Sequence, residues 1–206
     1  MKIAILGAAG VGATLGKRFA AIGHEIYFGV LTPSKHTDKT SFATIGTVAE
    51  ATKDAEMIVL AIPFAKVGEA IANCGDISGK IIVDCTNPLK MVDGKLGLSL
   101  GFDTSAAEQI AETAEGAKIV KCFNQTGVGN MDNPEYQNGR AVQFVCGDDA
   151  DAREIVRKLA ESIGFDAIDV GELKNSRLLE SFAALWIHLA FTTDLNRNFA
   201  FSLLRR

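Results

Sequence analysis

The sequence has few of the residues from which metal sites and nucleic-acid-binding surfaces are built. Its 206 residues include three histidines and four cysteines, and no two of the cysteines form a Cys-x-x-Cys pair. No cysteine has a nearby histidine at the spacing of a metal site. Lys and Arg number 21 against 25 Asp and Glu, which gives a net charge of −4 without a basic tract. We therefore expect no metal site and no nucleic-acid partner.

The sequence also lacks long apolar runs. The longest lies near residues 182–191 and is interrupted by His188, so no run reaches the ~18 residues that a membrane span needs. The run that follows Lys2 is too short for the core of a signal peptide. Cys85, Cys122 and Cys146 lie in or beside apolar runs typical of strands, where small thiols are usually buried and reduced. These features predict a cytoplasmic protein without membrane contact.

Short β-rich runs alternate with helical patterns along the chain. We expect strands at residues 2–6, 25–29, 57–62, 80–85, 118–123, 142–146 and 166–170. We expect helices at 11–22, 64–73, 104–115 and 151–163, and a last helix from residue 172 or 175 to about 204. The helix at 104–115 would take Asp103 or Thr104 as its N-cap.

This alternation predicts a Rossmann-type, doubly wound α/β fold with a mainly parallel sheet and a short C-terminal helical extension. Residues 1–171 would form the dinucleotide-binding domain and residues 172–206 the extension. The glycine-containing segment 88–102 would be a mobile loop near a site.

A glycine-rich segment, Gly7-Ala8-Ala9-Gly10-Val11-Gly12-Ala13, follows the first expected strand and opens the first helix. Two dinucleotide-binding patterns fit it, Gly7-x-Ala9-x-x-Gly12 and the looser Gly7-x-x-Gly10-x-x-Ala13. In both, a glycine makes the tight turn, a small residue lets the backbone approach the pyrophosphate, and the helix N-terminus faces the phosphate charge. We predict a dinucleotide site here, with a purely structural turn as the alternative.

The second expected strand carries no acidic residue at its end, where an NAD-binding site usually has one for the ribose hydroxyls. Thr32, Ser34 and Lys35 follow it, and then His36. Hydroxyl groups and a cation suit a 2′-phosphate. We therefore expect NADP in preference to NAD, with a solvated polar loop as the alternative interpretation of these residues.

Further segments make the sequence similar to a known family. They are Gly23-His24-Glu25-Ile26, Ala61-Ile62-Pro63, Asp84-Cys85-Thr86-Asn87-Pro88-Leu89, Thr104-Ser105-Ala106-Ala107-Glu108 and Lys118-Ile119-Val120-Lys121-Cys122-Phe123-Asn124. With the glycine loop, they resemble the reductases that pass hydride between NADP and the deazaflavin coenzyme F-420. The oxidoreductase domain of the Steap metalloreductases is similar, and the resemblance runs from residue 1 to about 200.

The resemblance implies roles for the matching positions. It places the glycine loop at the pyrophosphate, that is Gly7, Ala8, Ala9, Gly10, Val11 and Gly12. It places Ala61, Ile62 and Pro63 at the border of the cofactor, and Lys35 at the 2′-phosphate. It places four residues near the nicotinamide: Asn87, Pro88, Phe123 and Asn124. The family has a Ser-Arg pair where this chain has Val30-Leu31, which removes a bidentate phosphate partner that a lysine does not replace.

The chemistry depends on whether a proton donor is needed. Hydride transfer to a flat ring such as deazaflavin or flavin needs alignment rather than a protein acid or base, whereas reduction of a ketone or imine usually needs a donor. His188 is the candidate donor, with a core or interface position as its alternative. Asn87 and Asn124 end strands at the ligand-binding edge and would hold the carboxamide or the substrate, unless they only form turns.

We therefore assign no catalytic residue and expect an NADP-dependent oxidoreductase with a small redox co-substrate, deazaflavin or flavin. A carbonyl or imine reductase and a non-catalytic dinucleotide-binding sensor or regulatory subunit are the alternatives. The absence of a convincing acid or base favours the first and the last.

The last expected helix is apolar over a wide arc. Its large apolar residues are Leu178, Phe182, Leu185, Trp186, Leu189 and Phe191. A helix of this kind should be buried against something, and large aromatic residues are the usual anchors of an interface. We therefore expect a homodimer through this helix, with Trp186 and Phe182 at its centre.

Overall fold

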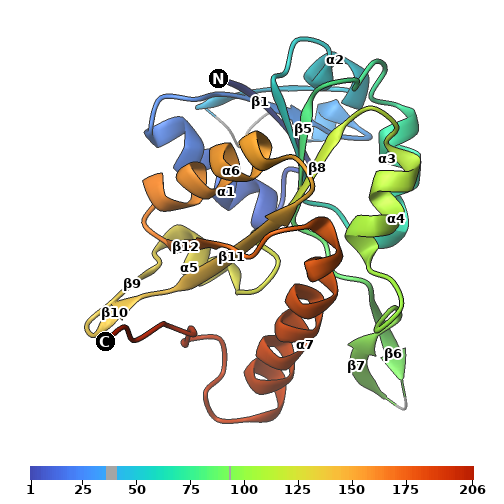
Figure 1. The fold of residues 1–206 in the computed structure, drawn as a ribbon. Coiled ribbons are helices and arrows are strands. Elements are labelled where there is room, and N and C mark those ends of the chain that lie inside the picture. Colours follow the sequence, from blue (N-terminus) through green and yellow to red (C-terminus); the bar gives the residue numbers. More distant parts are fainter. Residues whose placement is uncertain (36–40, 93) are drawn as a thin grey trace.

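The computed structural model describes residues 1–35, 41–92 and 94–206, and within them an eight-stranded sheet forms the centre of the molecule (Figure 1). Its strands are β1 (Lys2–Leu6), β2 (Glu25–Gly29), β3 (Ala43–Gly46), β4 (Met57–Leu60), β5 (Ile81–Asp84), β8 (Lys118–Lys121), β11 (Val142–Gly147) and β12 (Asp166–Asp169). They lie in the order β12-β11-β8-β5-β4-β1-β2-β3. Neighbouring strands are parallel except for the antiparallel pair β8 and β11. The predicted Rossmann-type fold with a mainly parallel sheet is confirmed.

Helices cover both faces of this sheet (Figure 1). They are α1 (Val11–Ala21), α2 (Val48–Thr52), α3 (Val67–Ala72), α4 (Ala106–Thr113) and α6 (Ala150–Ser162), followed by α7 (Ser176–Thr192). Since successive side chains of a strand point to opposite faces, Ile3 and Ile5 of β1 pack in the core under α1 and α6, while Ala4 and Leu6 pack with α2, α3 and α4. The central strands are buried on both faces, which explains their unbroken apolar runs.

The helix boundaries follow their capping residues. Asp149 accepts a hydrogen bond from the amide of Ala152 and starts α6, and Gly164, at φ +106°, follows its end. Asp103 or Thr104 was expected as the N-cap of α4, but the N-cap is Ser105. Its hydroxyl accepts a hydrogen bond from the backbone amide of Glu108. Ser105 is fully buried, so its hydroxyl is held in place for this role.

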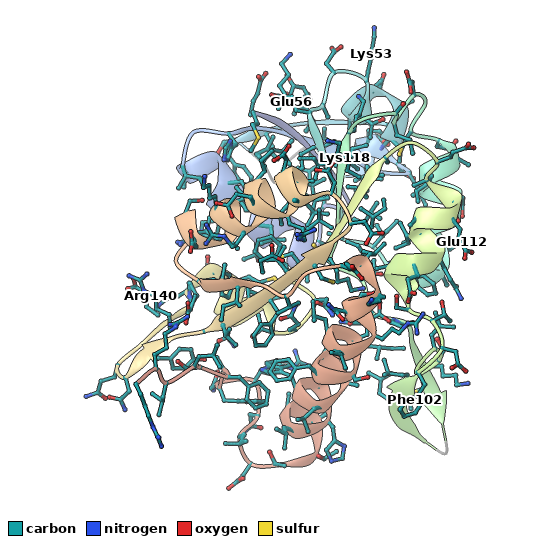
Figure 2. All side chains as sticks on the ribbon, viewed as in Figure 1. Lys53, Glu56, Phe102, Glu112, Lys118 and Arg140 are labelled. Carbon is teal, nitrogen blue, oxygen red and sulfur yellow. The ribbon has the colours of Figure 1, made fainter. Side chains whose placement is uncertain are left out.

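Several elements were not expected. They are β3, α2 and α5 (Val128–Asp132), the 3-10 turns η1 (Pro33–Lys35), η2 (Phe64–Lys66) and η3 (Leu173–Asn175), and the hairpins β6 (Leu89–Val92) with β7 (Lys95–Leu98) and β9 (Glu135–Tyr136) with β10 (Gly139–Arg140). The β6–β7 hairpin replaces the expected loop at 88–102 and contacts α7. Phe102, 97% exposed, stands beside this hairpin just ahead of α4 (Figure 2).

Helix α7 ends at Thr192 and not near residue 204, which corrects the expected length of the last helix. The hydroxyls of Thr192 and Thr193 bond back to the carbonyls of His188 and Leu189, at 2.6 and 2.7 Å. Such back-bonding by β-branched residues competes with continuation of the helix. Thr193 is extended, and Asn196, at φ +54°, turns the chain.

The chain after this turn, residues 197–206 and called the tail below, packs back onto α7. The ring of Phe199 stacks on Trp186 with 5.2 Å between the ring centroids, and the ring centroids of Phe201 and Phe182 are 4.6 Å apart. Trp186 is therefore buried within its own chain, 5% exposed. Its expected place at the centre of a dimer interface is wrong, because the tail supplies the cover that the sequence suggested a second subunit would give.

No helix of the residues described has the length and apolarity needed to cross a membrane.

Candidate functional site

The turn between β1 and α1 has the geometry that the glycine pattern predicts. Gly7 and Gly10 have φ values of +104° and +48°, which L side chains rarely adopt. A Cβ on Gly7 would lie 2.5 Å from the carbonyl oxygen of Ala61, and one on Gly12 would lie 1.9 Å from the carbonyl oxygen of Gly7. Gly12 is therefore the packing glycine of the register Gly7-x-Ala9-x-x-Gly12, and Gly10 is the residue that starts the helix.

The N-terminus of α1 is open to an anion. Gly10 is its N-cap, no side chain caps it, and its first turn holds no acidic residue. Ala9 and Gly10 are exposed, while Ala8 and Val11 are half-buried and pack on the core. Free N–H groups and the helix dipole favour a phosphate at such a terminus, so this turn fits the pyrophosphate of a dinucleotide.

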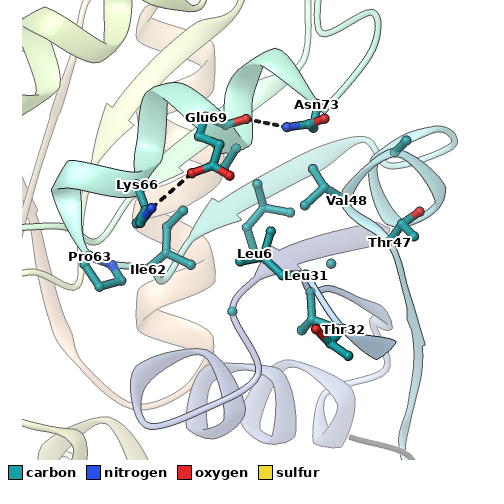
Figure 3. A pocket seen from close by; sticks show the side chains of 15 residues that line it. Leu6, Leu31, Thr32, Thr47, Val48, Ile62, Pro63, Lys66, Glu69 and Asn73 are labelled. Carbon is teal, nitrogen blue, oxygen red and sulfur yellow. Dashed lines mark hydrogen bonds and ion pairs between the residues drawn. The ribbon is translucent and has the colours of Figure 1, made fainter. Parts of the chain in front are cut away.

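A cavity of about 610 Å³ lies beside this turn, where β1, β2 and β4 end (Figure 3). Sheets of this order bind ligands outside the carboxyl ends of the strands, where the strand order reverses, and here it reverses between β1 and β4. Four residues expected from the sequence line the cavity: Gly7, Thr32, Ile62 and Pro63. Ala61 does not line it but contacts the glycine turn from behind.

Sequence reasoning missed the far wall of the cavity. Thr47 lines it from the start of α2, and Lys66, Glu69 and Asn73 line it from the start and the end of α3 (Figure 3). Lys66 Nζ lies 3.2 Å from Glu69 Oε2, and Asn73 Nδ2 donates to the carbonyl oxygen of Glu69 at 2.7 Å. The Lys66–Glu69 pair is exposed and therefore weak, so its lysine is available to an anionic ligand.

The residues expected at a 2′-phosphate divide. Thr32 borders the cavity, whereas Ser34 is exposed on the 3-10 turn η1 and is not part of the lining. Lys35 ends the same turn, and its side chain lies outside the described part of the structure, as does the whole of His36.

The two expected asparagines meet at the ends of β5 and β8. Asn87 Nδ2 donates to the carbonyl oxygen of Asn124 at 2.8 Å, and Asn124 Nδ2 donates to Asn87 Oδ1 at 2.9 Å. Asn124 is buried and Asn87 half-buried. The two residues therefore form a reciprocal pair, through one side-chain and one backbone acceptor, that joins the two strand ends and fixes the amide of Asn87.

The other two residues expected beside them contribute differently. Phe123 has φ +60° and a fully buried ring that packs between Phe19 and Phe165, so only its backbone faces the strand ends. Pro88 is buried, and its carbonyl oxygen accepts the amide of Ser99 beyond the β6–β7 hairpin at 2.6 Å.

Comparison with known proteins identifies the family. The family model described as NADP oxidoreductase, coenzyme F420-dependent, matches residues 2–88. The F420-dependent NADP reductase of Methanothermobacter marburgensis is 30% identical over 213 residues, which cover 92% of each protein. The chain belongs to the F420-dependent NADP reductase family. A crystal structure of a putative F420-dependent NADP reductase from Arthrobacter sp. FB24 superposes with a TM-score of 0.89, at 32% identity over the full length of both chains.

Two further likenesses reach beyond F420-dependent NADP reductases. Rat metalloreductase STEAP3 is 27% identical over 182 residues, which cover 87% of this chain and 36% of that protein. The chain thus spans about a third of that relative. A reductive aminase from Aspergillus terreus, of which the match covers 61%, superposes with a TM-score of 0.67 at 20% identity. That likeness concerns the fold alone.

In this chain, a buried network of charged side chains lies beside the Asn87–Asn124 pair, and the sequence analysis did not predict it. Lys121 Nζ donates to Asp84 Oδ2 at 2.7 Å, to the carbonyl oxygen of Thr86 at 2.7 Å and to Glu180 Oε1 at 2.8 Å. Burial alone lowers the pKa of Lys121, but the attraction of Asp84 and Glu180 outweighs it and raises the pKa above its ordinary value. The lysine therefore stays charged.

His188, the candidate proton donor, lies neither in the lining of the cavity nor at the Asn87–Asn124 pair. It is exposed on α7, on the same stripe as Leu178 and Leu185. Within residues 1–35, 41–92 and 94–206, no three His, Cys, Asp or Glu side chains are grouped so that they could hold a metal ion.

Proposed function

We propose that this chain passes a hydride between NADP and a flat redox coenzyme of the deazaflavin type, with flavin as the second candidate acceptor. The observation that carries the proposal is the glycine turn that opens onto a 610 Å³ cavity at the reversal of strand order. The full-length likeness to F420-dependent NADP reductases supports the same activity.

The residues divide the binding work between two ends of the site. The open N-terminus of α1 holds the pyrophosphate, and the cavity between Thr32 and Asn73 receives the adenosine end. The Asn87–Asn124 pair faces the nicotinamide, whose carboxamide matches the donor and acceptor of an asparagine amide. When bound, NADPH supplies the hydride, and the acceptor ring takes it up together with a proton from solvent. The chain contributes alignment, which supplies a large part of the rate in such reactions.

A carbonyl or imine reductase finds less support. Such an enzyme usually needs a proton donor beside the reacting carbon, and His188 is exposed on α7. Among the described residues, the ends of β5 and β8 present the amides of Asn87 and Asn124 and no histidine. The reductive aminase shares the fold alone.

Purified protein and NADPH, followed by the absorbance of the reduced nicotinamide, test this proposal. Oxidised deazaflavin, FMN, ferric chelates and small carbonyl compounds are added in turn. We expect fast oxidation with deazaflavin, slower or no oxidation with FMN, and none with carbonyls. Oxidation with carbonyls alone would favour the carbonyl reductase, and binding of NADPH without oxidation by any acceptor would favour the regulatory alternative.

We also propose that NADP is preferred to NAD. The proposal is supported by the absence of an acid at the end of β2 in the sequence and by Thr32 and Lys66 in the lining of the cavity. Either Lys35 or Lys66 is then the cation for the 2′-phosphate. Fluorescence titration of Lys35→Ala and Lys66→Ala with NADPH and NADH distinguishes them: we expect one variant to lose about tenfold in NADPH affinity, the worth of one charge-assisted contact, with NADH binding unchanged. Equal loss for both cofactors, or a wild type that prefers NADH, would contradict the proposal.

We further propose a cytoplasmic homodimer built on α7. Burial of the rest of α7 leaves Leu178, Leu185 and Phe191 exposed, at 68%, 47% and 62%. Leu178 and Leu185 are seven residues apart and thus lie on one stripe of the helix, and a stripe of this kind suits a second copy of itself about a two-fold axis. The four cysteines, all free and buried, suit a reducing compartment.

A further inference from the structure

The network around Lys121 joins four segments that lie far apart in the sequence. Besides the lysine, Glu180 of α7 accepts the amides of Ala106 and Ala107 in the first turn of α4, at 3.1 and 3.3 Å. Asp84 Oδ1 accepts the amide of Thr86 at 2.8 Å. The ends of β5 and β8, the start of α4 and the second turn of α7 are thereby held by one set of hydrogen bonds.

This network is costly to bury and offers little stability in return. Lys121 and Asp84 are fully buried and Glu180 is 2% exposed, so one cation faces two carboxylates away from water. Apolar side chains of similar volume are often as stable as a buried ion pair. The contribution of these charged groups therefore lies in the geometry that they impose on the segments they join.

That geometry leads directly to the asparagine pair. Thr86, whose carbonyl oxygen binds Lys121, precedes Asn87 in the chain. Leu179, which precedes Glu180, accepts Asn124 Nδ2 through its carbonyl oxygen at 3.3 Å. The network is thus connected to Asn87 through Thr86 and to Asn124 through Leu179 of α7.

The hydrogen bonds of the Asn87–Asn124 pair leave one N–H hydrogen of Asn87 without an acceptor in the described part of the chain. Asn124 Nδ2 has two hydrogens, and they go to Asn87 Oδ1 and to the carbonyl oxygen of Leu179. Asn124 Oδ1 accepts from Gln125 Nε2 at 2.8 Å. Asn87 Nδ2 spends one hydrogen on the carbonyl oxygen of Asn124, and its second hydrogen has no partner among the residues that the structure describes. Asn87, the more exposed of the two, is thus the residue that can bind a ligand.

We propose that Lys121, Asp84 and Glu180 are positioning residues that hold the Asn87 amide for the carboxamide of the nicotinamide. The inference rests on the proposed function, which puts the nicotinamide at this pair. It assigns the network a task in the recognition of one half of the cofactor, distinct from the phosphate turn and the adenosine cavity.

The test separates the two halves of the cofactor and needs no acceptor. Dissociation constants are measured for NADPH and for 2′-phosphoadenosine diphosphoribose, which lacks the nicotinamide. We expect Glu180→Gln and Asn87→Ala each to weaken NADPH about tenfold, the worth of one well-placed hydrogen bond, and to leave the fragment unchanged. The double variant is expected to lose no more than either single variant, since both act on the same contact.

Arg177→Gln is the matched control. Arg177 Nη2 pairs with Glu108 Oε1 at 2.6 Å and so links α7 to α4, as Glu180 does, without contact to the strand ends. We expect it to change neither dissociation constant. A loss of NADPH affinity equal to that of Glu180→Gln would mean that any loosening of α7 has this effect, and would overturn the inference.

The remaining outcomes are equally decisive. If Asn87→Ala weakens NADPH and Glu180→Gln does not, the nicotinamide site stands and the role of the network is overturned. If Asn87→Ala has no effect, the proposed site is wrong and the inference falls with it. Should Glu180→Gln fail to fold, Glu180→Asp keeps the charge but shortens the reach to Lys121 and α4, and the same selective loss is expected of it.

Discussion

At the scale of single residues, Gly12 has the least room for a Cβ among the glycines compared in the described part of the chain. The nearest atom to an added Cβ is the backbone oxygen of Gly7, at 1.9 Å, and this oxygen cannot move without a shift of the phosphate turn. We expect Gly12→Ala to lower the free energy of unfolding by roughly 1–3 kcal/mol, the usual range for overpacking, and to weaken NADPH and NADH alike. Urea denaturation and fluorescence titration measure the two effects.

Gly68→Ala is the control for this prediction. A Cβ on Gly68, in α3, meets nothing within 4 Å, and alanine is favoured over glycine in a helix by about 1 kcal/mol. It should therefore bind both cofactors normally and unfold no more easily than the wild type. If Gly12→Ala behaves in the same way, the close approach of α1 to the turn has no part in binding.

At the scale of elements, the helices with clear periodicity and caps were predicted closely. The expected helix at 151–163 is α6 at 150–162, because an Asp cap and a terminal glycine flank its apolar stripe. Helix α2 was missed although Thr47 and Glu50 form a capping box, a signal that is visible in the sequence. The β6–β7 hairpin was missed although Asp93-Gly94 is a common hairpin sequence.

The same distinction holds for the site. The glycine turn is local in sequence and was predicted, but Lys66 and Glu69 reach the cavity only because the sheet brings α3 beside the turn. Lys121 is 37 residues from Asp84 and 59 from Glu180. No local pattern encodes such contacts, since they depend on the strand order and on the docking of α7.

The end of α7 and the tail that covers it form one unit that can be tested by fluorescence. Trp186 is the only tryptophan of the chain, and it is stacked on Phe199. We expect Phe199→Ala to shift the tryptophan emission to longer wavelength and to lower the free energy of unfolding by roughly 2–4 kcal/mol, the cost of removing a packed aromatic side chain. Phe102→Ala, which removes a side chain that is 97% exposed, should do neither. An unchanged emission in Phe199→Ala would contradict the observed packing of the tail.

At the scale of the whole molecule, the homodimer is tested on the outer stripe of α7 rather than at Trp186. Leu185 is 47% exposed, so a glutamate there disturbs a dimer but not the core of the subunit. We expect the wild type to sediment as a dimer at micromolar concentration and Leu185→Glu as a folded monomer. Ile155→Glu, at a position 39% exposed on α6, is the control and should remain dimeric. A monomeric wild type would end the dimer proposal.

The proposed function requires that hydride pass directly from the nicotinamide to a deazaflavin-type ring. A deazaflavin accepts the hydride on carbon, so a transferred deuterium does not exchange with water. NADPH deuterated at C4 of the nicotinamide, as each of its two epimers, is incubated with the protein and oxidised deazaflavin, and the reduced deazaflavin is weighed by mass spectrometry. We predict full transfer of deuterium from one epimer and none from the other, because an aligned site exposes a single face of the nicotinamide. Failure to oxidise NADPH, or a reduced deazaflavin without deuterium from either epimer, would contradict the account.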